Sequence, residues 1–560
     1  MTHDMNAYGS DVVLAVGGFG ALRGSSCPGI EAVTLHTAVA GTDSTGSPVS
    51  ISLHKEGILA DVPSPTWIAR DGDLLYAVLE DTNEVASFRI NRNAAATENA
   101  EIGDAETSEV ATDNATADNT TIDNTSTEDS KIGDTETSEV ATNNTVTGDI
   151  TISNTATEDS KIGDAETNEV ATNNTATDNT AINNTTAGDT AAMPTLTELS
   201  RVPASGISPT HAVVATDDIG GKHLIVANYA DGHVCVHPIA TDGSLLAPTQ
   251  VLAGEGHGPL PAQEGPHAHW ILPLPDGRVL STDLGADRIY VHHWRSGELV
   301  RVGVVRLAAG TGPRDLHLLP VADHSHATTF GADWRVAVVG EWADTVTLLG
   351  PVPGSSDKAD GQNDDPTQAT DSDGIRVLQA VSLGGDALDQ AASLAFVPWT
   401  VLRRGIRQTM DNNGSSAGAA YCNPGSRNND RTRDADAHGS IEYGITSGSP
   451  ISESPTTIPI DESSAAGIAY VGLRGSERIV ALAWDGEYLS RLAPEHEPGW
   501  RGRGIDCGGS RPRHIMRVGN VLLVANEVSN NLTVFRLGLD GEPARAADLP
   551  SGSPTVFVRL

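Results

Sequence analysis

The stretch SPTVFVRL, residues 553–560, decides the fold because its partner lies at the opposite end of the chain. It starts with a small residue and proline and then turns apolar. Six earlier stretches do the same or nearly the same: SPTWIA from Ser64, SPTHAVV from Ser208, GPHAHWIL from Gly265, GPRDLHLL from Gly312, QAASLAFV from Gln390 and RPRHIMRV from Arg511. Each of these six is followed by a second apolar run, whereas the seventh such run, VVLAVGG from Val12, lies near the N-terminus. The two ends of the chain are therefore expected to complete one unit together.

A third strand follows in every unit and alternates apolar with polar residues, as in EVASFRI, HVCVHPI and LTVFRLG. Short strands, glycine-bearing turns and a repeat of roughly 50 residues are typical of a propeller. We therefore predict an all-β, seven-bladed β-propeller whose N- and C-terminal strands share one blade. The C-terminal strand is expected to be innermost, which closes the ring and leaves no exposed sheet edge.

Three polar insertions interrupt the units, so the propeller is predicted to comprise residues 1–96, 193–353, 375–403 and 465–560. Residues 97–192 repeat with a period of 30 residues and hold 21 acidic residues against two lysines, about half of the net charge of −39. Without aromatic residues this stretch is expected to be a disordered acidic insertion at the outer edge of a blade. A β-solenoid is the alternative. Residues 354–374 and 404–464 are the two other insertions.

Composition excludes some classes of function. The acidic balance and the absence of a basic patch argue against a nucleic-acid partner. Cys27, Cys235, Cys422 and Cys507 are far apart and match neither a disulfide framework nor a zinc knuckle. With no apparent leader and no run of about 18 apolar residues, a cytoplasmic protein without a membrane partner is expected.

Candidate site residues fall at two positions that recur in every unit. The first position follows the small residue and proline that open each unit, and it holds Thr66, Thr210, His267, Arg314, Ala392, Arg513 or Thr555. The second position is the end of the second strand, at Glu80, Tyr229, Leu284, Glu341, Arg474, Glu527 or Gly18. Asn228, Asp283 and Asn526 directly precede three of these ends. Because the apolar strand bodies are similar while these ends differ in charge, the pattern indicates a site built on a repeated scaffold.

Together, ANYADG from Ala227, GPHAHW, STDLGADRIYV from Ser281, GTGPRDLHLLP from Gly310, VVGEWADTVTL from Val338 and LLVANEVSNNLTVFRL from Leu522 resemble the lactonase family of seven-bladed propellers. The resemblance covers every blade but not the insertions. It implies hydrolysis of a sugar lactone, 6-phosphoglucono-δ-lactone in the first place, without a cofactor or metal. It also implies a site formed by His267 or His269, Arg314, Glu341 and Arg474. The chain departs from the family pattern at Gly340 and Leu473, where asparagine is common.

The chemistry of these residues suits that reaction. Opening a lactone with water requires a base and a donor for the developing oxyanion. We expect His267 or Glu341 to be the base and Arg314 the oxyanion donor. Substrate contacts are expected from His269, Arg474, Arg513, Asn228, Asp283, Asn526 and Glu527. Of the two histidines, His267 is predicted to be catalytic and His269, further along the strand, to be a packing residue.

Other interpretations stay open at this point. The histidines alternate with Ala268 and can be a structural pair, while a zinc site lacks a third ligand at suitable spacing. Arg314 and Arg513 can form salt bridges between blades with Glu341 and Glu527. On the same scaffold a lactone-forming cycloisomerase is a second function, and a non-catalytic propeller that binds a partner is a third. The sequence leaves the oligomeric state open.

Overall fold

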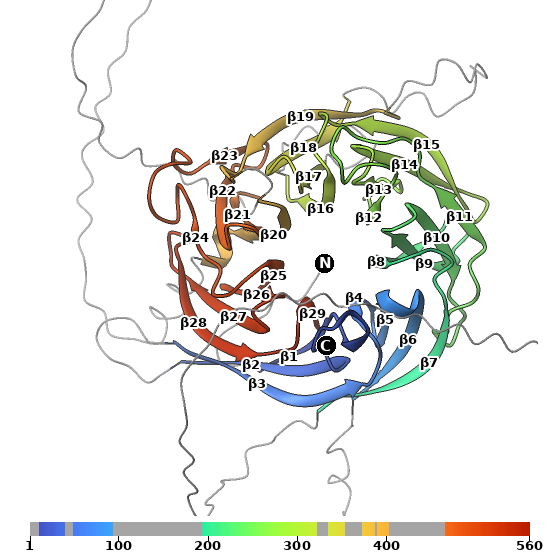
Figure 1. Cartoon of the computed structure of the whole chain (residues 1–560), viewed down its shortest axis with the longest axis horizontal. Coiled ribbons are helices and arrows are strands. Elements are labelled where there is room, and N and C mark those ends of the chain that lie inside the picture. The colour runs from blue at the N-terminus through green and yellow to red at the C-terminus, as the bar shows by residue number, and fades with distance from the viewer. Residues whose placement is uncertain are drawn as a thin grey trace, which may run out of the picture. The chain divides into compact units, whose positions relative to one another are not determined.

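Seven antiparallel sheets stand around a central axis, each forming one blade of a propeller (Figure 1). The computed structural model describes residues 11–39, 49–92, 193–321, 334–352, 372–386, 389–402 and 465–560. From the axis outward, blade 1 consists of β4 (Pro65–Asp71), β5 (Leu74–Leu79), β6 (Glu84–Asn91) and β7 (Thr195–Pro203). Blade 2 consists of β8 (Pro209–Thr216), β9 (Lys222–Asn228), β10 (His233–Pro238) and β11 (Gln250–Ala253). Blade 3 consists of β12 (Ala268–Pro273), β13 (Val279–Asp283), β14 (Arg288–Arg295) and β15 (Glu298–Arg306).

Blades 4 to 7 continue the same order. Blade 4 consists of β16 (Pro313–Leu319), β17 (Arg335–Gly340), β18 (Thr345–Pro351) and β19 (Ile375–Ser382), and blade 5 of β20 (Ala391–Pro398), β21 (Gly467–Leu473), β22 (Arg478–Trp484) and β23 (Leu489–Arg491), with β24 (Ile505–Asp506) also paired to β22. Blade 6 consists of β25 (Pro512–Val518), β26 (Val521–Asn526), β27 (Asn531–Leu537) and β28 (Pro543–Pro550). Blade 7 consists of β29 (Pro554–Arg559), β1 (Val12–Gly18), β2 (Ile30–Val39) and β3 (Val49–Ala60). Two 3₁₀ turns, η1 (Ala21–Arg23) and η2 (Glu80–Thr82), follow second strands.

The ring closes in blade 7, as the sequence predicts. Strand β29 is innermost and pairs antiparallel with β1, from Leu14 opposite Arg559 to Gly17 opposite Val556. It also contacts β25 of blade 6 and β4 of blade 1. The predicted seven-bladed propeller and the strand shared by the two ends of the chain are therefore confirmed.

Each blade buries both faces of its second strand against its neighbours, which is why the second strands are apolar without alternation. Between blades 4 and 5, for example, Val339 and Val346 pack in one cluster with Val471 and Val480, and all four side chains are fully buried. The outermost strands are more exposed, as in β28. Recognisable second and third strands therefore mark the blades in the sequence, and the structure adds the fourth.

The predicted insertions lie outside the described residues, except for residues 372–374 of the second one. The first insertion separates β6 from β7, the third and fourth strands of blade 1. This agrees with the predicted place at the outer edge of a blade.

Candidate functional site

Two backbone positions in every blade face the upper end of the axis, defined here as the end at which the innermost strands start. In blades 1, 2, 4, 5, 6 and 7 the residue before the innermost strand has a positive φ: Ser64, Ser208, Gly312, Gln390, Arg511 and Ser553. Its carbonyl accepts the amide hydrogen of the residue after the second strand, as in Glu80 to Ser64 at 3.1 Å and Glu341 to Gly312 at 2.8 Å. This turn places the first-strand residue and the second-strand end side by side.

The same hydrogen bond corrects two sequence assignments. In blade 7 it is Phe19, not Gly18, whose amide reaches Ser553, and Gly18 pairs with Pro554 within the sheet. In blade 3 the amide of Leu284 reaches the carbonyl of His267, so His267 is equivalent to Ser64 or Gly312. Strand pairing starts at Ala268 opposite Asp283, as it starts at Pro313 opposite Gly340 in blade 4.

His269, not His267, is therefore the residue of blade 3 that corresponds to Arg314, Arg513 and Thr66. His269 is 94% buried and lines a cavity of about 30 Å³ between the innermost strands. This cavity is lined at the first-strand position by Thr66, Thr210, His269, Arg314, Arg513 and Thr555. The sequence alignment placed His267 at this position because the extra residues before β12 displaced it by two, and the structure places His269 there.

His267 lies beside the site. It precedes β12, so the expected alternation with His269 along one strand face is absent. Its Nδ1 donates to the backbone carbonyl of Tyr229 at 2.7 Å, and its ring stacks on the Tyr229 ring at 4.5 Å. The Tyr229 ring in turn meets His269 edge-on at 6.2 Å. His267 thus supports Tyr229 from the side of blade 3.

Glu341 joins two arginines at the upper end of the axis. Its Oε2 lies 3.2 Å from Nε of Arg314 in the same blade and 2.7 Å from Nη2 of Arg474 in blade 5. Burial alone would raise the pKa of the Glu341 carboxyl, but the Arg474 and Arg314 guanidinium groups outweigh it and lower the pKa. Glu341 is therefore an ionised anchor for the arginines at neutral pH and a poor proton acceptor.

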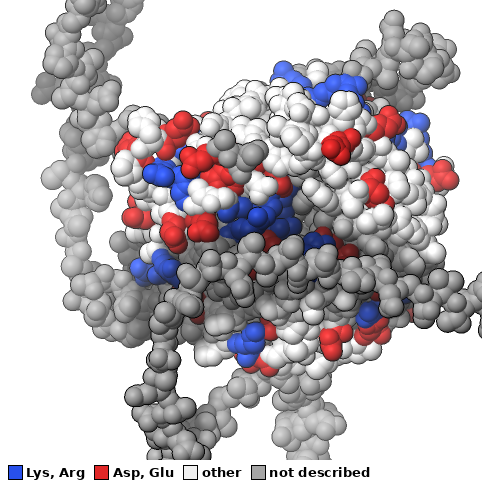
Figure 2. All heavy atoms as spheres, in the orientation of Figure 1, with Lys and Arg blue, Asp and Glu red and all other residues white. Residues whose placement is uncertain are grey.

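A second charged group belongs to blade 6. Nη1 of Arg513 lies 2.9 Å from Oε2 of Glu527, and Nε of Arg511 lies 3.7 Å from the same oxygen. The Arg513 guanidinium also lies over the Phe19 ring at 4.8 Å. The Arg314–Glu341 and Arg513–Glu527 salt bridges are thus formed within blades, whereas Arg474–Glu341 joins blades 5 and 4. Figure 2 shows Lys and Arg side chains close to the middle of the ring on the face drawn.

Arg314 and His269 are both withdrawn from water. Burial, followed by the neighbouring guanidinium groups, lowers the pKa of Arg314 to about 10, so it keeps its charge at neutral pH. Burial and the charges of Arg314 and Arg513 hold the pKa of His269 well below its usual range. His269 is consequently a neutral imidazole next to permanent positive charge.

Three residues predicted to contact substrate hold loops instead. Asn228 donates to the carbonyl of His233 at 3.1 Å, and Asn526 donates to that of Cys507 at 3.3 Å. Asp283 accepts the amide hydrogens of His267 and Ala286 at 2.9 and 3.1 Å. Gly340 and Leu473 occupy the same position in blades 4 and 5 and have no side-chain group that can make such hydrogen bonds.

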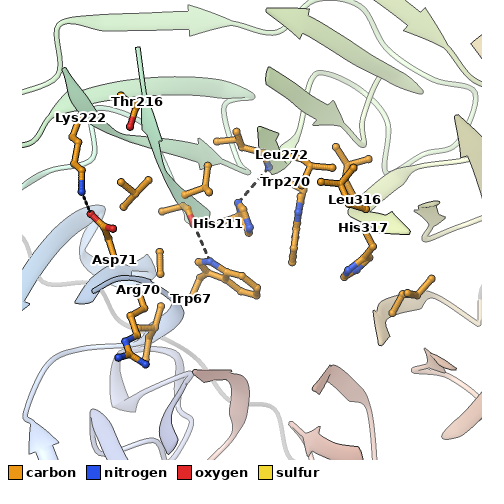
Figure 3. A pocket seen from close by; sticks show the side chains of 18 of the residues that line it. Trp67, Arg70, Asp71, His211, Thr216, Lys222, Trp270, Leu272, Leu316 and His317 are labelled. Atoms are coloured by element: carbon orange, nitrogen blue, oxygen red, sulfur yellow. Dashed lines mark hydrogen bonds and ion pairs between the residues drawn. The ribbon is translucent and has the colours of Figure 1, made fainter. Parts of the chain in front are cut away.

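The lower end of the axis opens into a cavity of about 720 Å³, which the sequence did not indicate. Figure 3 shows Trp67, His211, Trp270 and His317 around it. The rings of His211 and Trp270 stack at 3.9 Å, and Trp67 meets both at 4.6 and 4.7 Å. Nδ1 of His211 accepts the amide hydrogen of Ile271, and Nε1 of Trp67 donates to the carbonyl of Ala212. These side chains thereby tie neighbouring innermost strands together.

Sequence reasoning also passed over Asp315, which follows Arg314 in the quoted GPRDLHLL and is 1% exposed. The alternation of Asp315 with His317 along one strand was the available signal, because alternate residues share a face. Among the described residues no cluster of His, Cys, Asp and Glu suits a metal ion. Cys27, Cys235 and Cys507 are buried free thiols, while Cys422 lies outside the described residues. None of the helices in the described ranges is long and apolar enough to span a membrane.

Comparisons with known proteins agree with this architecture. Residues 169–349 match the family model described as "Lactonase, 7-bladed beta-propeller". The chain is 36% identical over 135 residues to a 6-phosphogluconolactonase of Bacillus subtilis, which is 24% of this chain and 38% of the relative. It is 35% identical over 156 residues to an uncharacterized protein of Lactococcus lactis, 27% of this chain and 41% of the relative. The matches thus span about two fifths of the length of these curated relatives.

Solved structures extend the likeness in fold to the whole ring. A crystal structure of a putative 6-phosphogluconolactonase from Bacteroides fragilis has a TM-score of 0.51 at 15% identity, with 98% of both chains covered. A crystal structure of a protein from Lactobacillus plantarum has a TM-score of 0.51 at 17% identity, with 98% of this chain and 100% of that one covered. At such identities the likeness concerns the fold alone.

Proposed function

Since this chain has the seven-bladed propeller of the lactonase family, we propose that it is a lactone hydrolase whose active site is the upper end of the axis. The observation that carries the proposal is the meeting of a neutral imidazole, His269, with the charged Arg314 around a polar axial cavity. Matches to the lactonase family model and to a named 6-phosphogluconolactonase support the same reaction class.

The residues divide the work as follows. Arg314 donates a hydrogen bond to the carbonyl oxygen of the lactone as that oxygen gains negative charge. Such a hydrogen bond stabilises the charge most in a site that excludes water. His269 takes a proton from the attacking water and returns it to the ring oxygen when the bond between that oxygen and the carbonyl carbon breaks. Glu341 holds Arg314 and Arg474 in place through its two salt bridges. In this assignment His269 replaces His267 as the base.

We further propose that the substrate is anionic, with 6-phosphoglucono-δ-lactone as the first candidate. Arg474, Arg511 and Arg513 lie at the same end of the axis as Arg314, and the Arg511 side chain is 40% exposed. Guanidinium groups bind phosphate or carboxylate oxygens through paired N–H donors. An exposed arginine at the entrance is suited to a group at the far end of the sugar acid.

The decisive experiment is a turnover assay on freshly generated 6-phosphoglucono-δ-lactone and on the unphosphorylated lactone, each corrected for spontaneous hydrolysis. We expect turnover of at least one lactone, a higher kcat/KM for the phosphorylated one, and loss of that preference in Arg511→Gln. Arg545→Gln is the matched control, because Arg545 is 51% exposed on the outer strand of blade 6. A folded protein that turns over neither lactone would refute the proposed activity, and equal kcat/KM values would refute the anionic substrate alone.

A further inference from the structure

Asp315 contacts both residues to which the proposed function assigns chemistry. It follows Arg314 on β16, and its side chain is 1% exposed. Its Oδ1 accepts from Nη1 of Arg314 at 2.7 Å and lies 4.0 Å from Nδ1 of His269. Nη1 of Arg314 also donates to the carbonyl of Ala392 at 2.6 Å, which fixes the direction of the guanidinium. One buried carboxylate thus lies against the arginine and the histidine of the site.

The second oxygen of Asp315 points to the other end of the axis. Oδ2 lies 3.7 Å from Nε2 of His317, and neither atom has a hydrogen-bond partner in the structure. Nδ1 of His269 is likewise buried without a partner. His317 lines the cavity at the lower end, where its side chain is 21% exposed (Figure 3). The row His269, Asp315 and His317 therefore runs along the axis from the upper site to the lower cavity.

This row of buried polar side chains lowers the stability of the folded protein, so we look for its reason in function. A buried carboxylate needs several donors, and each buried polar atom without a partner opposes folding. Here the two histidine nitrogens lie beyond hydrogen-bonding range of Asp315, at 4.0 and 3.7 Å, and contacts in an unliganded site often tighten only when substrate binds. The other charged or titratable groups that act on this row are Arg314, Arg474, Arg513, His211 and His514.

We propose that Asp315 is the positioning residue of this site. Its Oδ1 accepts a hydrogen bond from Nδ1–H of His269, so that Nε2 is left unprotonated and free to take the proton of the attacking water. The same oxygen holds Arg314 toward the lactone carbonyl. His317 donates to Oδ2 from the lower cavity and keeps the carboxylate in this orientation. No proton passes to Asp315: the proton moves from water to Nε2 of His269 and then to the departing ring oxygen.

This inference rests on the proposed function, and Asp315→Asn tests it. An amide in place of a carboxylate keeps the shape but favours the wrong imidazole tautomer, which in comparable sites removes most of the rate. We expect kcat to fall by about a hundredfold or more with KM little changed. His317→Asn, which removes only the donor to Oδ2, is expected to cost less than about tenfold, since Arg314 still holds Oδ1.

Asp217→Asn is the matched control. Asp217 is a buried carboxylate that follows β8 in blade 2 and lies 2.7 Å from Nε2 of His223, and it lines neither axial cavity. The substitution Asp217→Asn makes the same chemical change as Asp315→Asn, and we expect it to lower the melting temperature without lowering kcat. If Asp315→Asn keeps kcat within about threefold while folded, or loses no more than Asp217→Asn does, Asp315 is a structural residue and the proposal is overturned.

A readout independent of turnover separates this proposal from the proposed function. In ¹⁵N-histidine spectra of the intact wild-type protein, His269 should carry its hydrogen on Nδ1, and Asp315→Asn should shift it toward Nε2. A wild-type His269 protonated on Nε2 would overturn the role of Asp315 even if the variant fails to fold. If no lactone is hydrolysed but the tautomer changes as expected, the proposed activity fails while the positioning by Asp315 stands.

Discussion

Removing residues 553–560 should destabilise the whole ring rather than one blade. The deletion takes away β29, in which Val556 and Phe557 are 0% and 2% exposed. Burial of two such side chains contributes about 3 to 6 kcal/mol. The strand also holds its neighbours, since Thr555 donates to the carbonyl of Thr66 and the amide of Phe557 donates to His514. With about 1 kcal/mol for each of these bonds, the loss is comparable with the total stability of an ordinary domain.

The assay is urea unfolding followed by tryptophan fluorescence and far-ultraviolet circular dichroism. We expect the deletion to abolish the cooperative transition, and Phe557→Ala, which spares the backbone, to lower the free energy of unfolding by about 3 to 5 kcal/mol. Ile58→Ala is the control in the same blade, because Ile58 is 56% exposed and should change stability by less than about 0.5 kcal/mol. A deletion variant that unfolds at the midpoint of the intact protein would refute the closure argument.

The other predictions concern the insertion, the two histidines and the buried His514. Deleting residues 97–192 should leave the melting temperature and lactone turnover nearly unchanged, because they separate only β6 from β7; insoluble protein would show that the repeat is structural. His269→Ala should lower kcat by about a hundredfold in a folded protein, whereas His267→Ala should lower it by less than about tenfold; the opposite order in the turnover assay would restore His267 as the base. Burial, with smaller contributions from charged neighbours, lowers the pKa of His514 to about 4. Because this folded-state pKa lies below the unfolded one, its contribution to stability is complete above about pH 6.5 and is lost as the pH falls toward 4. Urea midpoints measured from pH 7 to 4 should therefore fall less steeply in His514→Asn than in the wild type.

The sequence predicts the blades well and the site only in part, for a physical reason. Second strands such as β26 are buried on both faces, so their apolar residues mark them in any window of the sequence. Outer strands such as β28 are largely exposed, so burial does not dictate their residues and they leave no comparable pattern. Charged residues at strand ends, including Arg314 and Glu341, are recognisable because apolar neighbours surround them.

The sequence did not show which of the two histidines faces the axial cavity, because that depends on register. His267 and His269 differ by two residues, and only the hydrogen bond from Leu284 reveals which of them starts the turn. Asp315 was overlooked for a related reason, because an acidic residue beside an arginine suggests an ordinary surface pair until three-dimensional packing buries it. Residue type thus indicated which charged residues gather at the upper end of the axis, while their geometry required the fold.

The pairing of β29 with β1 also has a mechanical consequence. The two strands are antiparallel and start to separate at the same place, where the amide of Leu560 donates to the carbonyl of Val13. A force applied to Val12 and Leu560 in opposite directions would load this outermost hydrogen bond first and then the next, opening the ladder like a zipper. A force that slides one strand along the other would load all these bonds at once. The ring should therefore open at low tension when pulled at this seam, and at higher tension when pulled between two residues of neighbouring blades.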